Sequence, residues 1–341
     1  MKALVIETPD VLKVEQVEKP AIGDYDALCQ LLYGATCTGT DLHVIHGNFG
    51  IPITYPTIIG HESIGRVVEV GGKVRNYKVG DLITRVGAQE SQGMHVSWGG
   101  MAQFGMARDH QAMKEDGIDR AQWDGFRVNQ VIPEGLIDPL DATMIITWRE
   151  TLSYVTRMGI GKGAKVLVSG SGANGFSIAR QSLNLGAESV SFIGSEARRG
   201  TAQRLGMAQY IDYRDQQAVK AFIDGNGRTF DYIIDATGKS GSLNHLLPCL
   251  KAEGTIGVYG MDDYLNYNIM PLNADCTFRF YNGGYDEEET HQAVLKLISE
   301  GKLDAGAWLD KDNIFSMDDA ARAYDHVAQK KAIKSVVKLT D

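Results

Sequence analysis

Residues 36–43 read TCTGTDLH and bring a thiol, hydroxyls, a carboxylate and an imidazole into eight positions, with a second histidine at His46. Thiolate, imidazole and carboxylate groups are the ligands that zinc prefers in proteins. A hydroxyl close to an imidazole can also carry a proton away from a reacting group. The stretch therefore indicates either a metal site with a proton relay or a polar loop, and for His46 the loop interpretation fits better.

A glycine-rich segment in the second half of the chain indicates a different chemistry. Residues 166–175 read VLVSGSGANG, in which three glycines form the pattern GxGxxG between an apolar strand and a helical stretch. Glycines in this context permit a tight turn and let the backbone approach a pyrophosphate at the helix N-terminus. The alternative is a glycine-rich connection without a ligand. The residues expected to contact a dinucleotide are Gly170, Gly172, Ala173, Asn174 and Gly175.

The end of the next predicted strand bears on which dinucleotide binds. Folds that prefer NAD usually place an Asp or Glu there to bind the ribose hydroxyls, but 24 residues after Gly170 this chain has Gly194. The missing carboxylate favours NADP, whereas Glu196 in the same loop leaves NAD possible. Arg198 and Arg199 have the alternative of being the solvated start of a helix. The residues expected to make room for a 2′-phosphate or to surround it are Gly194, Ser195, Arg198, Arg199 and Tyr213.

Two types of element must position these groups. Up to about residue 110, short apolar runs lie between Gly and Pro turns, which predicts an irregular, largely antiparallel β domain. From about residue 160, strand-like and helical stretches alternate, which predicts βαβ units and a doubly wound parallel sheet. After about residue 286, helical stretches precede a final apolar strand, KSVVKL. The predicted fold class is α/β with an additional, mainly β domain.

Length, charge and cysteine content set the broad class of protein. The 341 residues suffice for two domains, and the net charge of -9 argues against nucleic acid or an anionic membrane as partner, because both would repel the chain. A small-molecule partner is expected. The first residues become acidic too early for a signal peptide or a membrane span, so we expect a cytoplasmic protein. The cysteines are too scattered for a disulfide framework: Cys29, Cys37, Cys249 and Cys276.

Three motifs together resemble the medium-chain dehydrogenase/reductase superfamily. They are GHESIGRVVEVG at 60–71, KVGD at 78–81 and TDLH at 40–43, and the similarity extends over nearly the whole chain. Within the superfamily the chain is most similar to the zinc-dependent sorbitol and alcohol dehydrogenases. The resemblance implies a Rossmann doubly wound parallel sheet plus a GroES-like, mainly β catalytic domain. The implied domains are a GroES-like catalytic domain at 1–152, an NAD(P)-binding Rossmann domain at 153–285 and a return to the catalytic domain at 286–341.

The resemblance also implies an activity. It is hydride transfer between NADP(H) and a polyol, sugar or secondary alcohol or ketone, with one catalytic zinc as Lewis acid. A homodimer or homotetramer is implied as well. The residues implied are Cys37, His61 and Glu62 as zinc ligands, Glu62 with a part in catalysis, Thr40 as the hydroxyl that contacts substrate, His43 as the proton relay and Asp41 as the acid that orients His61.

Cys37 stands one residue earlier than the family places its zinc cysteine, and Thr38 occupies that position here. One interpretation is an inserted residue, with a bulge that Gly39 makes possible and that turns the thiol back toward the metal. The other is a lost ligand, because neighbouring side chains of an extended segment point to opposite sides. Both interpretations stay open on sequence alone.

The fourth ligand of the family, about 24 residues before Gly170, falls near Ile146, which offers no ligand atom. Three ligands and a water would still make a catalytic site. Glu150 could hold that water, or it could form a surface or interdomain salt bridge, and Asp141 is a weaker candidate. No cysteine lies between Asp81 and Glu150, so the second, structural zinc of many family members is not expected.

In many family members the structural zinc holds the loop in this region. Here residues 93–103, GMHVSWGGMAQ, must close the loop by packing alone. Within this segment, His95 and Trp98 either border the substrate cleft or pack as ordinary side chains.

Two other functions compete with a zinc enzyme. The first is a zinc-free NADP(H) reductase of the same superfamily, acting on a carbonyl or an activated alkene, in which His43 or Thr40 replaces the metal as acid. The second is a non-catalytic NADP-binding protein, which would bind the cofactor tightly without turnover.

Overall fold

The computed structural model describes residues 1–91, 93–263 and 265–340. The chain divides into two compact units: unit 1 comprises residues 1–146 and 287–341, and unit 2 comprises residues 147–286. Unit 1 therefore takes in both ends of the chain, and unit 2 is a continuous insertion into it.

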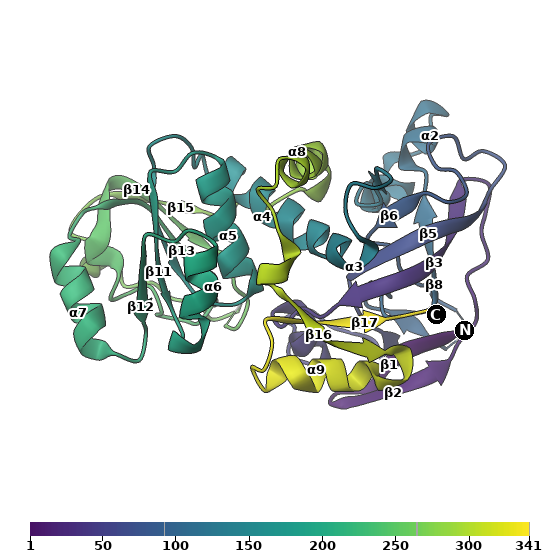
Figure 1. Cartoon of the computed structure of the whole chain (residues 1–341), viewed down its shortest axis with the longest axis horizontal. Helices are drawn as coiled ribbons and strands as arrows, with labels where there is room; N and C mark the ends of the chain where they lie inside the picture. The colour runs from purple at the N-terminus through teal and green to yellow at the C-terminus, as the bar shows by residue number, and fades with distance from the viewer. Residues whose placement is uncertain (92, 264, 341) are drawn as a thin grey trace. The chain divides into compact units, whose positions relative to one another are not determined.

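Unit 2 is built on a six-stranded parallel sheet with the order β12-β11-β10-β13-β14-β15. The strands are β10 (Lys165–Ser169), β11 (Ser189–Gly194), β12 (Gln209–Asp212), β13 (Phe230–Asp235), β14 (Leu250–Val258) and β15 (Phe278–Tyr281). The helices are α4 (Met144–Arg157), through which the chain enters the unit, α5 (Ala173–Asn184), α6 (Arg199–Arg204) and α7 (Gln216–Gly225). Figure 1 shows α5 and α6 on one face of the sheet and α7 on the other, as right-handed connections require. The predicted doubly wound parallel sheet is confirmed.

The central strands of unit 2, β10, β11 and β13, are largely apolar because helices cover both faces of the sheet. Leu167 of β10 and Ile233 of β13 are fully buried in a cluster that includes Phe222 of α7.

The backbone of the glycine loop between β10 and α5 is sterically constrained. A Cβ on Gly175 would lie 1.8 Å from the carbonyl oxygen of Gly170, and Gly170 itself has a φ of +116°, so both positions require glycine.

Unit 1 contains two sheets, one with the order β2-β1-β4-β7 and one with the order β16-β17-β3-β5-β6-β9, in which β8 also pairs with β3. The β4–β7 and β16–β17 pairs are parallel and the other pairs are antiparallel. This confirms the mainly β domain. The strands are β1 (Lys2–Thr8), β2 (Val11–Gln16), β3 (Asp26–Ala35), β4 (Thr57–Ile58), β5 (Glu62–Val70), β6 (Leu82–Thr84), β7 (His95–Val96), β8 (Phe104–Arg108), β9 (Val131–Ile132), β16 (Leu309–Ser316) and β17 (Lys334–Lys338).

Helices of unit 1 are mostly short and connect these strands. They are α1 (Thr40–Ile45), α2 (His110–Glu115), α3 (Pro139–Ala142), α8 (Glu287–Ser299) and α9 (Ala320–Ala328). Single 3-10 turns occur in both units: η1 (Arg120–Gln122), η2 (Asp124–Phe126), η3 (Glu196–Arg198), η4 (Leu247–Cys249), η5 (Pro271–Asn273), η6 (Ala305–Ala307) and η7 (Met317–Asp319).

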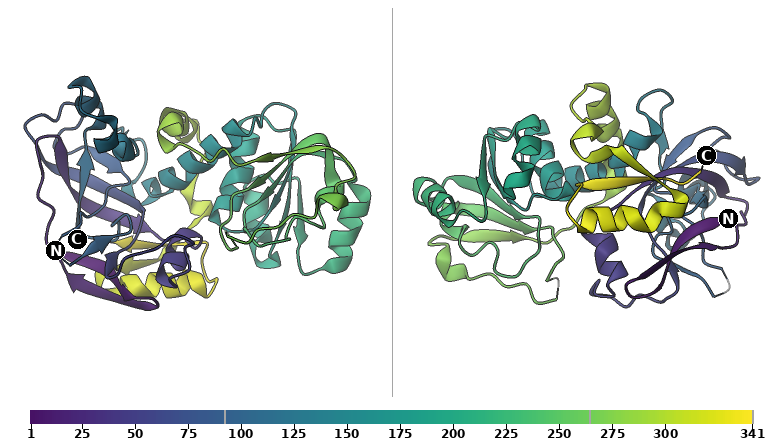
Figure 2. Two further views of the ribbon diagram at one scale, coloured as in Figure 1. Left: turned by 180° about the vertical axis from the view of Figure 1, so that it is seen from behind. Right: turned by 60° about the horizontal axis from the view of Figure 1, so that its bottom comes forward.

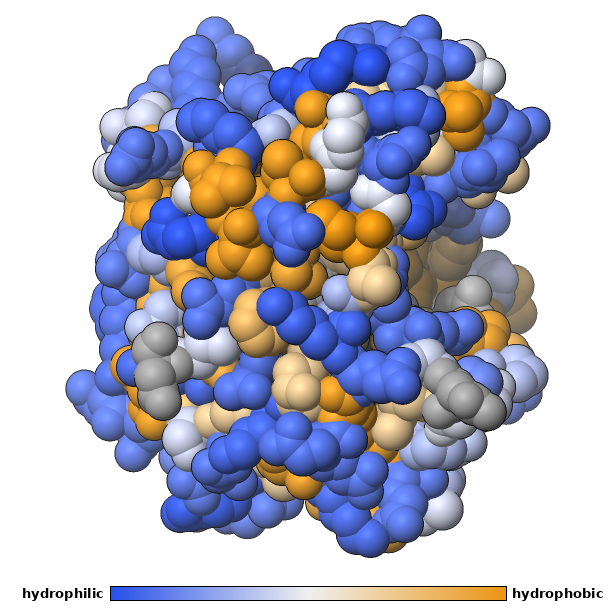
Figure 3. Space-filling view, turned by 90° about the vertical axis from the view of Figure 1, so that its right-hand side faces the viewer, coloured by the Kyte–Doolittle hydropathy of each residue, from blue (hydrophilic) through white to orange (hydrophobic). Residues whose placement is uncertain are grey.

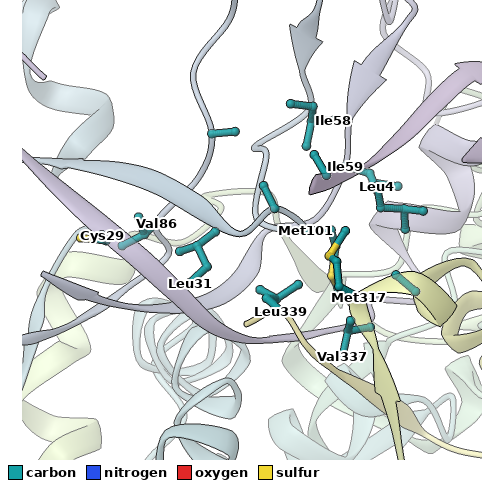
Figure 4. Close-up of a cluster of buried hydrophobic side chains, with 14 of the residues drawn as sticks. Leu4, Cys29, Leu31, Ile58, Ile59, Val86, Met101, Met317, Val337 and Leu339 are labelled. Carbon is teal, nitrogen blue, oxygen red and sulfur yellow. The ribbon is translucent and has the colours of Figure 1, made fainter. Parts of the chain in front are cut away.

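The core of unit 1 joins residues from both ends of the chain. Leu31 and Met101 cluster with Met317 and Leu339 from the C-terminal segment (Figure 4). Figure 2 shows the yellow C-terminal strands beside the purple and blue strands of the N-terminal segment, and β17 pairs directly with β3. The C-terminal segment thus completes the sheet that contains β3 and β5, and side chains from it reach the end of that strand pair.

Hydrophilic side chains dominate the face of the molecule in Figure 3, with one group of hydrophobic residues in its upper half. Among the described residues, no helix combines the length and the apolar character needed to cross a membrane.

Candidate active site

Three potential metal ligands converge inside unit 1. Cys37 Sγ, a ring nitrogen of His61 and a carboxylate oxygen of Glu62 all lie within 4.8 Å of one another, and no other such grouping occurs among the described residues. Paired strands bring them together, because Glu62 at the start of β5 lies opposite Ala35 at the end of β3. Cys37 follows β3 and His61 precedes β5, so both reach the same end of the strand pair. All three side chains are buried.

The backbone after Cys37 explains how the thiol reaches this cluster. The amide of Asp41 donates to the carbonyl of Cys37 at 3.1 Å, so the chain turns directly from β3 into α1. Gly39 has a φ of -73°, a value that any residue adopts. The special backbone freedom that we expected from Gly39 is therefore not used, and that part of the prediction is wrong. The tight turn itself directs the thiol toward His61 and Glu62.

Asp41 is the acid around which the cluster is ordered. It is fully buried, and its Oδ1 accepts from His61 Nδ1 at 2.9 Å. Its Oδ2 accepts from the amide of Cys37 at 3.0 Å and from the hydroxyl of Tyr324 at 3.0 Å. Because a carboxylate only accepts, Nδ1 of His61 carries the proton, and Nε2 faces Glu62, 3.9 Å from Oε1.

Electrostatics reinforces these hydrogen bonds. Burial by itself lowers the pKa of His61, but the charge of Asp41, the hydrogen bond to it and the interactions with Cys37 together outweigh burial, and the pKa lies well above its ordinary value. Burial and the charge of Asp41 together raise the pKa of Tyr324 well above its ordinary value. Tyr324 therefore keeps its proton and acts as the donor.

Lys334, like Tyr324, comes from the C-terminal segment and was not predicted. It is fully buried, pairs with Glu62 Oε2, and donates to the carbonyl of Thr36 at 3.3 Å. Burial by itself lowers the pKa of Lys334, but the charge and hydrogen bond of Glu62 together with the charges of Cys37 and Asp41 outweigh burial, so the pKa is raised and the lysine stays charged. Neither residue carries a sequence signal, because Lys334 begins an ordinary apolar strand and Tyr324 lies in an ordinary amphipathic helix.

The residues of the cluster fit a divalent cation such as zinc. A thiolate, an imidazole and a carboxylate are the ligand types that zinc prefers, and three protein ligands leave one position for substrate. Lys334 engages one oxygen of Glu62, which leaves the other to face His61. The thiolate of Cys37 and the carboxylates of Asp41 and Glu62 would carry three negative charges, which Lys334 and a divalent cation would balance.

Glu150 and Asp141, the candidates for a fourth position, make other contacts. Glu150 lies on α4 in unit 2, is buried, and accepts from the hydroxyl of Tyr259 at 3.3 Å. Because Glu150 is buried, the surface part of its interpretation as a surface or interdomain salt bridge is wrong. Asp141 pairs with Lys311 at 2.6 Å in unit 1. Neither acid belongs to the grouping of ligand atoms.

The two predicted relay residues, Thr40 and His43, lie three positions apart on α1 and thus on one face of it. Both are partly exposed. Nδ1 of His43 lies 2.9 Å from Oδ1 of Asn48, which fixes the ring. His46 is exposed and lies 2.5 Å from Asp10, a surface contact that agrees with its interpretation as a polar loop residue.

A pocket of about 620 Å³ opens beside His61. Trp98 forms part of its wall, with its ring centroid 5.3 Å from that of His61, whereas His95 is not among the lining residues. Trp98 has a φ of +66°, which is unusual for a bulky residue. Two arginines line the pocket and both pair with buried acids: Arg85 with Glu287, and Arg108 with Asp26. The charges of these arginines are thus largely neutralised, which suits an uncharged, hydroxylated compound.

A second pocket, of about 630 Å³, borders the glycine loop in unit 2. Three of the predicted cofactor residues line it, namely Gly170, Gly194 and Tyr213. Lys220 and Lys239, which were not predicted, line it as well. The predicted residues outside this lining are Gly172, Ala173, Asn174, Gly175, Ser195, Arg198 and Arg199. Of these, the residues from Gly172 to Gly175 form the N-terminal end of α5.

Arg198 and Arg199 were expected to surround a 2′-phosphate. Arg199 instead donates to both carboxylate oxygens of Glu196, each at 2.7 Å, and to the carbonyl of Tyr210 at 2.8 Å. Arg199 and Glu196, the two residues that argued for different nucleotides, therefore neutralise each other.

Comparison with known proteins places the chain in a family. Residues 23–118 match the alcohol dehydrogenase GroES-like domain, and residues 177–300 match the zinc-binding dehydrogenase domain. D-arabinitol dehydrogenase 1 of Uromyces fabae is 24% identical over 99% of this chain and 97% of its own length. NADP-dependent alcohol dehydrogenase C 1 of Mycolicibacterium smegmatis is 28% identical over 73% of this chain and 72% of its own length.

Solved structures share the fold. A protein of Sinorhizobium meliloti 1021, solved bound to NADP, has a TM-score of 0.79 and 22% identity, with 99% of this chain and 98% of that chain covered. The motifs and the two domain matches agree with the relatives and the shared fold, which cover nearly the full length of the chain. This chain belongs to the medium-chain dehydrogenase/reductase superfamily of oxidoreductases.

Proposed function

We propose that this chain is a zinc-dependent dehydrogenase that transfers hydride between NADP(H) and a polyol, sugar or secondary alcohol or ketone. The convergence of Cys37, His61 and Glu62, of which His61 lines a pocket of about 620 Å³, carries the proposal. An ordinary polar loop would gain nothing from burying these side chains around a fully buried acid, because burial of charge is costly unless it is compensated.

Each residue of the cluster has a task in this proposal. Bound zinc would supply a Lewis acid that stabilises the alkoxide formed as hydride leaves the carbinol carbon. Asp41 accepts from Nδ1 of His61, so Nε2 is the nitrogen that would give up its proton and bind the metal. On α1, the hydroxyl of Thr40 would contact the substrate oxygen, and His43 would take the alcohol proton outward.

The proposed cofactor is NADP, bound at the glycine loop. Gly194 ends β11 without a carboxylate that would repel a 2′-phosphate. Lys220 and Lys239 line the same pocket, and their pairs with Asp224 and Asp262 are exposed, so a phosphate can replace the acid as partner. The Mycolicibacterium smegmatis relative, named as NADP-dependent, supports this choice. The pairing of Arg199 with Glu196 reduces the contribution that Arg199 can make to binding a 2′-phosphate. NAD is the alternative cofactor.

A polyol or another small hydroxylated compound is the proposed substrate class. The neutralised arginines of the lining beside His61 and the name of the Uromyces fabae relative, a D-arabinitol dehydrogenase, support it. A homodimer or homotetramer is proposed from the family resemblance.

Metal analysis combined with turnover assays tests the function. We expect one zinc per chain in the purified protein, NADP-dependent oxidation of D-arabinitol or of a simple secondary alcohol, and loss of both zinc and turnover on chelation. Turnover without metal would favour the zinc-free reductase, an outcome for which Lys334 already supplies a countercharge to Glu62. Tight NADP binding without turnover over a broad panel of alcohols and carbonyl compounds would favour a non-catalytic protein.

A further inference from the structure

We propose that Tyr324 is a positioning residue for the metal cluster: its hydroxyl fixes Asp41 and, through Asp41, fixes both Cys37 and His61. This inference rests on the proposed zinc function and adds to it a residue from the C-terminal segment. Tyr324 and Asp41 are 283 residues apart, and the hydroxyl reaches Oδ2 of Asp41 at 3.0 Å.

The carboxylate of Asp41 connects three elements. One oxygen receives His61 Nδ1, and the other receives both the amide of Cys37 and the hydroxyl of Tyr324. The terminal torsion of an Asp side chain has a broad, soft profile, so the orientation of its carboxylate is set by its donors. Without the hydroxyl of Tyr324, the carboxylate loses the donor that does not itself belong to a ligand residue. Only His61 and the amide of Cys37 would then orient the carboxylate of Asp41. The positions of these two groups, which depend on that carboxylate, would be less well fixed.

The position of the Tyr324 hydroxyl is itself set by core packing. Tyr324 is 3% exposed, and it shares the buried face of α9 with Ala320, Ala323 and Val327. Ala320 and Ala323 belong, together with Tyr324, to the hydrophobic core of unit 1. A phenylalanine would fill the same space, so the hydroxyl is not needed for packing. A buried hydroxyl is costly unless it is hydrogen-bonded, and the partner that it has here is the acid that orients the metal ligands.

The test compares two variants that each remove a buried hydroxyl and leave the ring in place. Tyr324→Phe removes the donor to Asp41. Tyr77→Phe is the matched control, because Tyr77 is 7% exposed in the same unit and donates to a backbone carbonyl, 3.0 Å from the oxygen of Asn129. Zinc affinity is measured by competition with a chelator of known affinity. Thermal melts of the metal-free proteins report how much stability each variant loses.

We expect Tyr324→Phe to weaken zinc binding about tenfold, the size of effect typical when an outer partner of a metal ligand is removed. Tyr77→Phe should bind zinc like the wild type even where its melting temperature falls equally. With Co²⁺ in place of zinc, the thiolate-to-metal absorption band should change in Tyr324→Phe and not in Tyr77→Phe, because only the former disturbs the loop that carries Cys37.

Three results would overturn the inference. Equal zinc affinity in the wild type and Tyr324→Phe would remove the positioning role and leave the zinc function intact. Equal weakening in both variants would reduce the effect to general stability. Failure of the wild type itself to bind zinc would refute the proposed function, and the role of Tyr324 toward the metal would fall with it.

Discussion

The metal cluster of unit 1 and the glycine loop of unit 2 are built in opposite ways. The loop is one continuous run, and its constraint is local: a Cβ on Gly175 would strike the carbonyl of Gly170, five residues earlier. The cluster draws on four separate segments, and its ion pair between Glu62 and Lys334 joins residues 272 positions apart. A local constraint is visible in the sequence, whereas a distributed one exists only after the C-terminal segment has completed the sheet.

This difference predicts how each region responds to mutation. In unit 1, residues that touch no metal, such as Tyr324 and Lys334, should also affect zinc binding or stability, because they hold the ligands and balance their charge. In unit 2, a mutation in the glycine loop should change cofactor binding and stability according to the local backbone constraint at its position. It should leave zinc binding by the cluster unchanged.

Lys334→Met provides the strongest test of the distributed cluster. Removing one partner of a buried ion pair typically costs about 3–5 kcal/mol, and both side chains of this pair are buried. We expect a loss of that size in the free energy of unfolding of the metal-free protein, measured by urea denaturation. Added zinc should restore part of it, because a divalent cation supplies the missing positive charge.

Lys311→Met serves as its control, because Lys311 forms a partly exposed pair with Asp141 and such pairs contribute about 0–1 kcal/mol. Equal, small losses in the two lysine variants would show that the buried pair does not stabilise unit 1.

Cys37→Ser tests whether the thiol is a ligand. Removal of an outer partner already weakens metal binding about 10–100-fold, so loss of a direct ligand should weaken zinc at least about 100-fold. Zinc content after dialysis and chelator competition measure the change. Cys276→Ser in unit 2 should retain full zinc content, and an unchanged content in Cys37→Ser would exclude Cys37 from the site.

Gly175→Ala tests the local character of the loop. The added Cβ would lie 1.8 Å from a backbone oxygen, so the loop must shift, at a typical overpacking cost of about 1–3 kcal/mol. We expect weaker NADPH binding by fluorescence titration, a lower melting temperature and unchanged zinc affinity.

Gly172→Ala is the paired control for stability, because a Cβ there meets no atom within 4 Å. Loss of zinc affinity in Gly175→Ala would contradict the separation between the two regions.

The smallest expected effects concern the 2′-phosphate. Lys220→Ala and Lys239→Ala should each weaken NADP about threefold without changing NAD, an effect that salt reduces because both lysines are exposed. Arg199→Ala should change NADP affinity less, because Arg199 lies outside the lining of the pocket and makes two hydrogen bonds to Glu196, whereas each lysine lines the pocket and pairs only with an exposed acid. A larger effect at Arg199 than at the lysines, measured by titration at two salt concentrations, would reverse this assignment.

The fold was predictable because its signals are local and repeated. Alternating strands and helices after residue 160 indicated the parallel sheet, and the glycine pattern lay where a strand meets a helix. Individual contacts were less predictable. Gly39 was selected for a backbone freedom that it does not use, and Arg199 was selected for a phosphate although its charge is taken by a neighbour. Both errors have one cause. The type of a residue shows which roles its side chain or backbone can take, but its contacts in the folded protein decide which role it has.

By itself, the sequence determined the superfamily, the two kinds of sheet, and the residue types that could bind a metal and a dinucleotide. Only the tertiary structure decided that the thiol of Cys37 lies with His61 and Glu62, and that Lys334 and Tyr324 complete their surroundings. The physical reason is that short-range patterns record backbone preference and burial. The charge balance of a buried cluster, by contrast, depends on which distant segments the core brings beside it.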